Sequence, residues 1–133
     1  MGTGISSEPR ILRIDLPPAM PLLSLNDRIH HMSRSKITKL IRIEAAKAAK
    51  AQSFLPFRKA RIRVIFRAPD NRRRDFISGN LISSVKPAID GLVDAGVLRD
   101  DRDGIIVEMS LVRGENLPKL GQLIIQVIEV LDD

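Results

Sequence analysis

The chain has 133 residues, a length typical of one domain, and it contains no Cys, Trp or Tyr. The absence of cysteine excludes disulfide bonds, thiolate metal sites and cysteine nucleophiles, and it agrees with a cytoplasmic location. The net charge of +6 is unevenly divided: residues 28–74 hold 15 basic and two acidic side chains, whereas residues 75–133 hold five basic and 11 acidic ones.

The N-terminal part predicts a flexible tail over residues 1–9, followed by a single domain over residues 10–133. The tail lacks the basic and apolar segments of a signal peptide, and no apolar run of the chain reaches the roughly 18 residues needed to cross a bilayer. Residues 11–16 alternate between apolar and charged side chains, which predicts a strand. The prolines that follow end it.

Residues 35–52 are expected to form a helix with Ser33 or Ser35 as its N-cap. Its expected buried stripe consists of five apolar side chains, namely Ile37, Leu40, Ile41, Ala45 and Ala48. Five basic side chains fall on the opposite face, namely Lys36, Lys39, Arg42, Lys47 and Lys50. This basic half of the chain either attracts a polyanion such as nucleic acid or serves as a solubilising surface. The many alanines and the lack of large aromatics disfavour a membrane-surface helix.

Residues 61–68 alternate again, with three apolar side chains on one face and Arg61, Arg63 and Arg67 on the other, so a half-buried strand is expected. Residues 69–71 predict a turn. A second helix is expected within residues 81–95, beginning at Ser83 or Ser84 because proline at position 87 fits only a first turn. Residues 76–82 are then expected to be loop. The expected buried stripe of this second helix consists of Val85, Ala88, Ile89 and Leu92, and Gly96 is expected to end the helix.

Residues 104–112 and 123–130 are almost continuously apolar, which predicts two buried central strands joined by a turn over residues 114–121. The last segment could also be a short helix, but its β-branched content favours a strand. The expected order is β-α-β-α-β-β. The fold class is therefore α/β, a single-layer mixed sheet of about four strands with two main helices packed on it.

Acids and cations gather in the stretch 69–103. Carboxylates from separate segments can hold a divalent cation, and nearby cations can hold phosphate, so this stretch suggests metal-dependent chemistry on nucleic acid. Alternatively, the arginines at 72–74 belong to a solvated loop, and the adjacent acids at 100–101 to a solvated turn. Asp103 is expected to be a simple turn residue, and Asp94 to face solvent or pair with Arg99. The stretch holds Arg72, Arg73, Arg74, Asp75, Lys86, Asp90, Asp100 and Asp101.

The combination resembles the RusA-type Holliday junction resolvases, which many phages and prophages carry. The resemblance covers nearly the whole chain. It is carried by RRRD over 72–75, by Lys86, by DGLVDAGVLRDD over 90–101 and, more weakly, by SLNDR over 24–28. It implies a small α/β homodimer that binds four-way junctions and related branched DNA. Such dimers cut symmetric strands with Mg²⁺ or Mn²⁺, in DNA recombination and repair or in phage DNA processing, in the host cytoplasm if phage-encoded.

The resemblance also implies roles for individual residues. Asp75, Lys86 and Asp101 match the catalytic positions, and the implied metal ligands are Asp75, Asp90, Asp100 and Asp101. The residues expected to contact the DNA backbone are Asn26, Arg28, Lys36, Lys39, Arg72, Arg73 and Arg74.

One segment departs from the family pattern. The family usually reads D-x-D-N, whereas here Asp75 is followed by Phe76, Ile77, Ser78, Gly79 and Asn80, so isoleucine stands where the second aspartate is expected. Asn80 is the candidate for the family asparagine, displaced by a short insertion, because its spacing to Lys86 matches a related D-P-x-N branch. The missing acid leaves a second hypothesis open, namely a branched-DNA-binding protein without catalysis.

Overall fold

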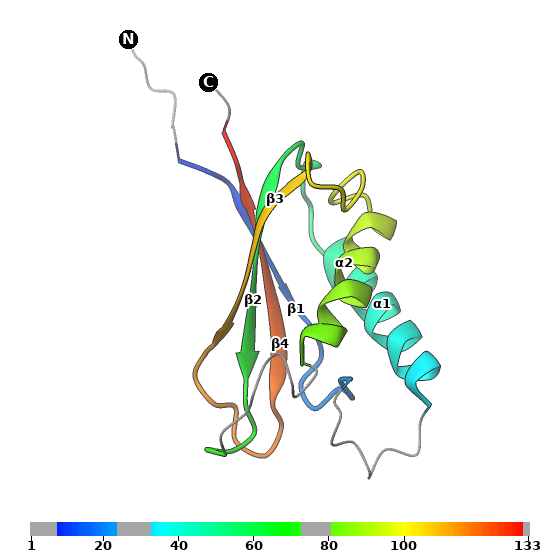
Figure 1. Cartoon of the computed structure of the whole chain (residues 1–133), viewed down its shortest axis with the longest axis vertical. Helices are drawn as coiled ribbons and strands as arrows, with labels where there is room; N and C mark the ends of the chain where they lie inside the picture. The colour runs from blue at the N-terminus through cyan, green and yellow to red at the C-terminus, as the bar shows by residue number, and fades with distance from the viewer. Residues whose placement is uncertain (1–7, 24–32, 73–80, 132–133) are drawn as a thin grey trace.

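A four-stranded mixed β-sheet carries both α-helices on one of its faces (Figure 1). The computed structural model describes residues 8–23, 33–72 and 81–131. Its elements are β1 (Ile11–Asp15), α1 (Arg34–Lys50), β2 (Ala60–Arg67), a 3₁₀ turn η1 (Leu81–Ser84), α2 (Val85–Asp94), β3 (Ile106–Arg113) and β4 (Gln122–Glu129). The expected α/β class and the order β-α-β-α-β-β are confirmed. No helix within the described ranges is long and apolar enough to span a membrane.

The strand order is β1-β4-β2-β3. Strand β4 pairs antiparallel with both β1 and β2, and β2 pairs parallel with β3. A parallel pair needs a long crossover, and the segment containing α2 supplies it. The last strand in sequence is thus a central strand of the sheet, and the segment 123–130 is confirmed as strand.

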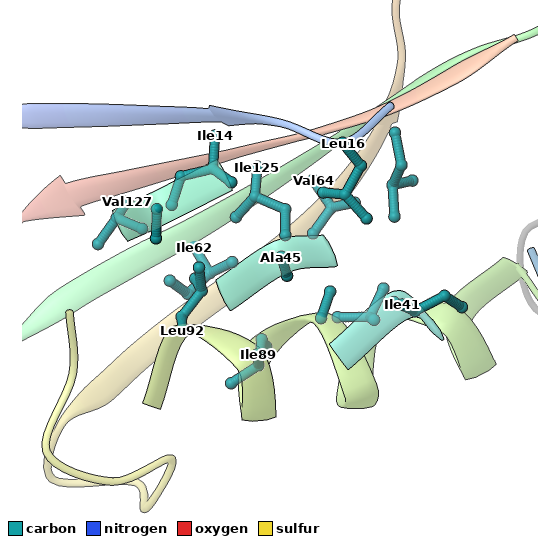
Figure 2. Close-up of a cluster of buried hydrophobic side chains, with 14 of the residues drawn as sticks. Ile14, Leu16, Ile41, Ala45, Ile62, Val64, Ile89, Leu92, Ile125 and Val127 are labelled. Atoms are coloured by element: carbon teal, nitrogen blue, oxygen red, sulfur yellow. The ribbon is translucent and has the colours of Figure 1, made fainter. Parts of the chain in front are cut away.

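The hydrophobic core lies between the helices and the sheet (Figure 2). Ile41 and Ala45 of α1 and Ile89 and Leu92 of α2 pack against alternate residues of the strands, namely Ile14, Ile62, Val64, Ile125 and Val127. All four stripe residues predicted for α2 are buried. On α1, Ala46 and Ala49 are buried, whereas Leu40 and Ala48 are only half-buried. The buried face of α1 is therefore rotated relative to the predicted stripe, and Ala45 and Ala46 lie against Gly91 of α2.

The prediction that residues 104–112 form a central buried strand is wrong. Strand β3 is at the edge of the sheet, next to β2 alone, and Val107 and Met109 remain exposed. A continuous apolar run does not distinguish a strand with two neighbours from an edge strand whose side chains border a groove. Here the apolar residues of β3 line a groove against α2.

Ser84 occupies the predicted N-cap position of α2, but its hydroxyl has another role. The side chain is fully buried, accepts a hydrogen bond from Leu23 N at 2.8 Å and does not cap the helix. Residues 81–82, expected to be loop, belong to the 3₁₀ turn that precedes α2. Ser84 therefore ties the start of α2 to the segment that follows β1.

We predict that Ser84→Ala lowers the free energy of unfolding by about 1–3 kcal/mol, because it leaves the buried amide of Leu23 without its acceptor. Ser83→Ala is the matched control, since Ser83 is half-buried and lies next in the chain; it should change the value by no more than about 0.5 kcal/mol. Urea denaturation of both variants measures the difference. Equal values for the two would show that the Ser84 hydroxyl contributes nothing.

Candidate active site

Lys86 joins two carboxylates that come from different parts of the chain. Its Nζ donates a hydrogen bond to Asp90 Oδ1 at 2.9 Å, one turn further along α2, and another to Asp101 Oδ2 in the loop before β3. Lys86 and Asp90 lie four residues apart, a spacing that places two side chains on one face of a helix. The structure adds Asp101, which lies 15 residues further along the chain.

The loop after α2 is held in place by buried residues. Gly96 ends the helix with φ +83°, a conformation that favours glycine. Val97 and Leu98 are fully buried, and Val97 O accepts a hydrogen bond from Phe57 N at 2.8 Å. These contacts hold residues 96–98, where the loop begins. The position of Asp101 beside α2 is therefore set by packing as well as by its ion pair with Lys86.

Asp100 braces the same loop and does not face Lys86. One of its oxygens accepts from Asp101 N at 2.7 Å, and the other pairs with Arg102 Nε at 2.9 Å. Both carboxylate oxygens are thus engaged within the loop. Of the implied metal ligands, the structure brings together Asp90 and Asp101, with Asp100 beside them.

The ion pairs shift the ionisation of the cluster. The pKa of Lys86 is raised, first by the hydrogen bond to Asp101 and then by that to Asp90. The pKa of Asp101 is lowered, mainly by the hydrogen bond from Lys86. At neutral pH Lys86 is therefore an ammonium group and Asp101 a carboxylate. The cluster is open to solvent, because the Lys86 side chain is 65% exposed.

We predict that Lys86→Met raises the pKa of Asp101 toward the ordinary aspartate value. The ion pair stabilises the fold above the unfolded-state pKa of Asp101, and this contribution is lost as pH falls through the lowered folded-state value. Carbon-detected NMR titration of the carboxyl groups measures the change. Asp94, whose pKa is lowered by Arg42, is the internal reference and should not move. An unchanged Asp101 titration would show that Lys86 does not control its charge.

Helix α1 reaches the cluster through Arg42. Its guanidinium pairs with Asp94 at 2.6 Å (Nε to Oδ2) and 2.8 Å (Nη2 to Oδ1), and its Nη1 lies 4.0 Å from Asp90 Oδ2. The predicted partners of Asp94, solvent or Arg99, are therefore wrong. Sequence reasoning missed this contact because it crosses between two helices, although Arg42 had been placed on the basic face of α1.

The cluster opens onto a groove of about 540 Å³ between α2 and β3. Lys86, Asp101, Asp103 and Glu108 supply its polar rim. Its apolar wall contains Ile82, Val85, Ile89, Ile106, Val107 and Met109. A groove that carries three carboxylates and an ammonium group beside an apolar wall can hold a charged ligand with its uncharged part against the wall.

The expected DNA contacts are only partly described. Lys36 and Lys39 are exposed on α1, toward its N-terminal end. Arg72 is exposed after β2 and pairs with Asp70 at 3.3 Å. The predictions for Asn26, Arg28, Arg73, Arg74, Asp75 and Asn80, and that of a flexible tail up to residue 7, fall on residues outside the described ranges.

The parallel pairing of β2 and β3 changes one geometric expectation. In the sequence, Asp75 follows β2 and Asp101 precedes β3, and loops beside neighbouring strands can converge. Ala60 pairs with Ile106 and Phe66 with Arg113, so the chain leaves β2 and enters β3 at opposite ends of the pair. Adjacent strands alone therefore do not bring Asp75 to Asp101.

The donor set at Lys86 suits a hard divalent cation. Asp90 and Asp101 direct one oxygen each toward the same ammonium group, and carboxylate oxygens are the ligands that Mg²⁺ and Mn²⁺ prefer. Across residues 8–23, 33–72 and 81–131, no three acidic or histidine side chains gather as metal ligands. The two carboxylates fit such an ion as part of a ligand set.

The chain was also compared with known proteins. No protein-family model matches it, and no curated protein matches it.

Proposed function

We propose that this chain is a metal-dependent endonuclease of the RusA type, which resolves Holliday junctions and related branched DNA by symmetric phosphodiester cleavage. One observation carries the proposal: Lys86 and two carboxylates from separate elements meet at the rim of a groove, beside a helix with an exposed basic face. Phosphodiester hydrolysis needs carboxylates for a metal ion and a cation for the phosphate, and both stand here.

Asp90 and Asp101, with Asp75 and Asp100, would hold the Mg²⁺ or Mn²⁺ ion. When bound, such an ion supplies Lewis-acid stabilisation of the phosphate and lowers the pKa of a coordinated water molecule. Lys86 stays protonated because of its two carboxylate partners. Its ammonium group can therefore stabilise negative charge on the phosphate or on the leaving oxygen.

The basic residues hold and position the DNA. Lys36, Lys39 and Arg72 are exposed cations, and Arg73 and Arg74 extend the run after β2. Contacts to phosphate fix the register of the substrate without reading its sequence. Asn26, Arg28 and Asn80 complete this proposed set.

The active form proposed here is a homodimer, because a two-fold axis places equivalent sites on two equivalent strands of a four-way junction. The proposed setting is DNA recombination and repair or phage DNA processing in the cytoplasm.

A second candidate function is a branched-DNA-binding protein without catalysis. Lys86 already engages one oxygen of Asp90 and one of Asp101 through direct hydrogen bonds, and Ile77 stands where the family usually supplies another acid. Both features lower the number of carboxylates available to a metal ion. Such a protein would bind junctions with the same cations and leave the strands intact.

A cleavage assay on a synthetic four-way junction separates the two functions. Wild type is incubated with the junction in Mg²⁺ and in Mn²⁺, and Asp75→Asn serves as the control. The endonuclease proposal expects paired, symmetric incisions by wild type and none by the variant. Binding without incision in either metal would reject catalysis and favour the second function.

A further inference from the structure

The sheet face turned away from the helices carries a strip of arginines. Both helices cover one face of the sheet (Figure 1), and Ile62, Val64 and Phe66 of β2 are buried under them. The alternate residues of β2 therefore point outward, and among them Arg61 and Arg63 are exposed and Arg67 is half-buried. Arg13 of β1 lies on the same outer face, since Leu12 and Ile14 are buried on the other.

Strand register aligns four hydrogen-bond donors across the middle of this face. Arg13 pairs with Gln126, Gln126 with Arg63, and Arg63 with Ser110, so the row crosses all four strands. With about 4.8 Å between strands, Arg13 and Arg63 stand about 10 Å apart along the row. Because all four donors lie on paired strands, their spacing is fixed by the sheet.

The face keeps an excess of positive charge. Arg13 pairs with Asp15 at 2.7 Å and Arg61 with Glu108 at 3.5 Å. Among the described residues, the Arg67 guanidinium donates to two neutral oxygens, Glu115 O and Gln122 Oε1, both at 3.2 Å. The side chain of Arg63 forms no hydrogen bond or ion pair with any residue of the described ranges, and its backbone is paired within the sheet. Four guanidinium groups thus face two carboxylates, and a guanidinium group stays charged at any physiological pH.

Charge complementarity favours a phosphate backbone over the other occupants of such a face. A second copy docked here about a two-fold axis would bring two positively charged strips together, and like charges in apposition oppose association. None of the outward-facing residues of the four strands is aromatic, so stacking of unpaired bases has no platform. Arginine donors in a fixed array match phosphate oxygens.

We propose that this outer face is a second binding surface for the phosphate backbone of duplex DNA, on the opposite side of the sheet from the two helices, of which α2 carries Lys86. The inference takes DNA as the polyanion from the proposed function but does not require cleavage. A chain with a DNA-binding surface on each side of its sheet can hold two duplex segments at once, and a branched substrate supplies two segments.

The test is the salt dependence of binding to a synthetic four-way junction, measured by fluorescence anisotropy in EDTA so that no strand is cut. Each phosphate contact contributes about 0.9 to the slope of log Kd against log salt concentration. Arg63→Gln is expected to lower the slope by about 0.9, and Arg61→Gln combined with Arg63→Gln by about twice that. Lys119→Gln is the matched control, because Lys119 is an exposed cation in the turn between β3 and β4; its slope should equal that of wild type.

An unchanged slope in Arg63→Gln, or an equal fall in Lys119→Gln, would overturn the inference. So would a change in self-association of Arg63→Gln, seen by sedimentation, with no change in slope. Circular dichroism checks that the variants are folded. Reduced slopes in the arginine variants, with no cleavage by wild type, would support this binding surface and reject the endonuclease proposal. Cleavage by wild type, with unchanged slopes in the variants, would support the endonuclease proposal and reject this binding surface.

Discussion

Asp101→Asn is expected to lower the rate of junction cleavage by about a thousandfold or more, while junction binding in EDTA stays as tight as that of wild type or becomes tighter. The substitution keeps the size of the side chain and removes the charge that pairs with Lys86 and that the proposed Mg²⁺ ion would require. Loss of a group that stabilises the transition state typically costs two to three orders of magnitude, and loss of the proposed metal ligand would also impair activation of water. Binding should not suffer, because the change removes negative charge near phosphate.

Asp103→Asn is the matched control for this experiment. Asp103 lies two residues further in the same loop and at the rim of the same groove, but it is exposed and makes no ion pair with Lys86 or any other described residue. Its variant should cleave at close to the wild-type rate. Single-turnover rates of both variants, with binding measured in parallel, give the comparison. If Asp101→Asn lost binding and cleavage together, or if both variants were equally impaired, Asp101 would have a structural role and the proposed catalytic assignment would fail.

Gly91→Ala is expected to destabilise the protein by about 2–3 kcal/mol, although alanine is the better helix former by about 1 kcal/mol. Gly91 lies where α2 crosses α1. A Cβ atom there would lie 2.3 Å from Arg42 O and 2.9 Å from Ala45 Cβ. The first of these atoms is backbone, so the two helices would have to separate.

Separation of the helices would also break the contacts of Arg42 with Asp94 and Asp90, so the proposed active site should be perturbed together with the fold. Gly104→Ala is the matched control, since a Cβ atom at Gly104 meets nothing within 4 Å. Its unfolding free energy should stay within about 0.5 kcal/mol of wild type. Guanidinium denaturation at one protein concentration measures both. Wild-type stability of Gly91→Ala would show that the helices can move apart without cost.

Local periodicity was enough to predict the elements of the fold. The alternation at residues 11–16 and 61–68 and the four-residue spacing on α2 correctly identified the buried faces, because these patterns follow from the geometry of a strand and of a helix. Proline at position 87 correctly limited the start of α2. The order of the strands could not be read in this way, since it depends on pairing between segments up to 117 residues apart, such as Ile11 with Ile128.

The candidate site was predictable to the same extent. The pair Lys86–Asp90 follows from helical spacing alone. The joining of Asp101 to this pair, the bracing role of Asp100 and the contact between Arg42 and Asp94 all depend on how the loop after α2 and helix α1 pack in three dimensions. Residue type suggested which acids are important, but only packing decides which of them share a cation.

The central position of β4 has a consequence for folding during synthesis. Strand β1 pairs only with β4, and β4 also provides one of the two neighbours of β2. While the chain is still emerging from the ribosome, β1 has no strand to pair with, and its backbone hydrogen-bonding groups stay unpaired until β4 has been synthesised. The sheet therefore assembles late and by long-range pairing, a topology associated with slow folding and with a need for protection of unpaired strands.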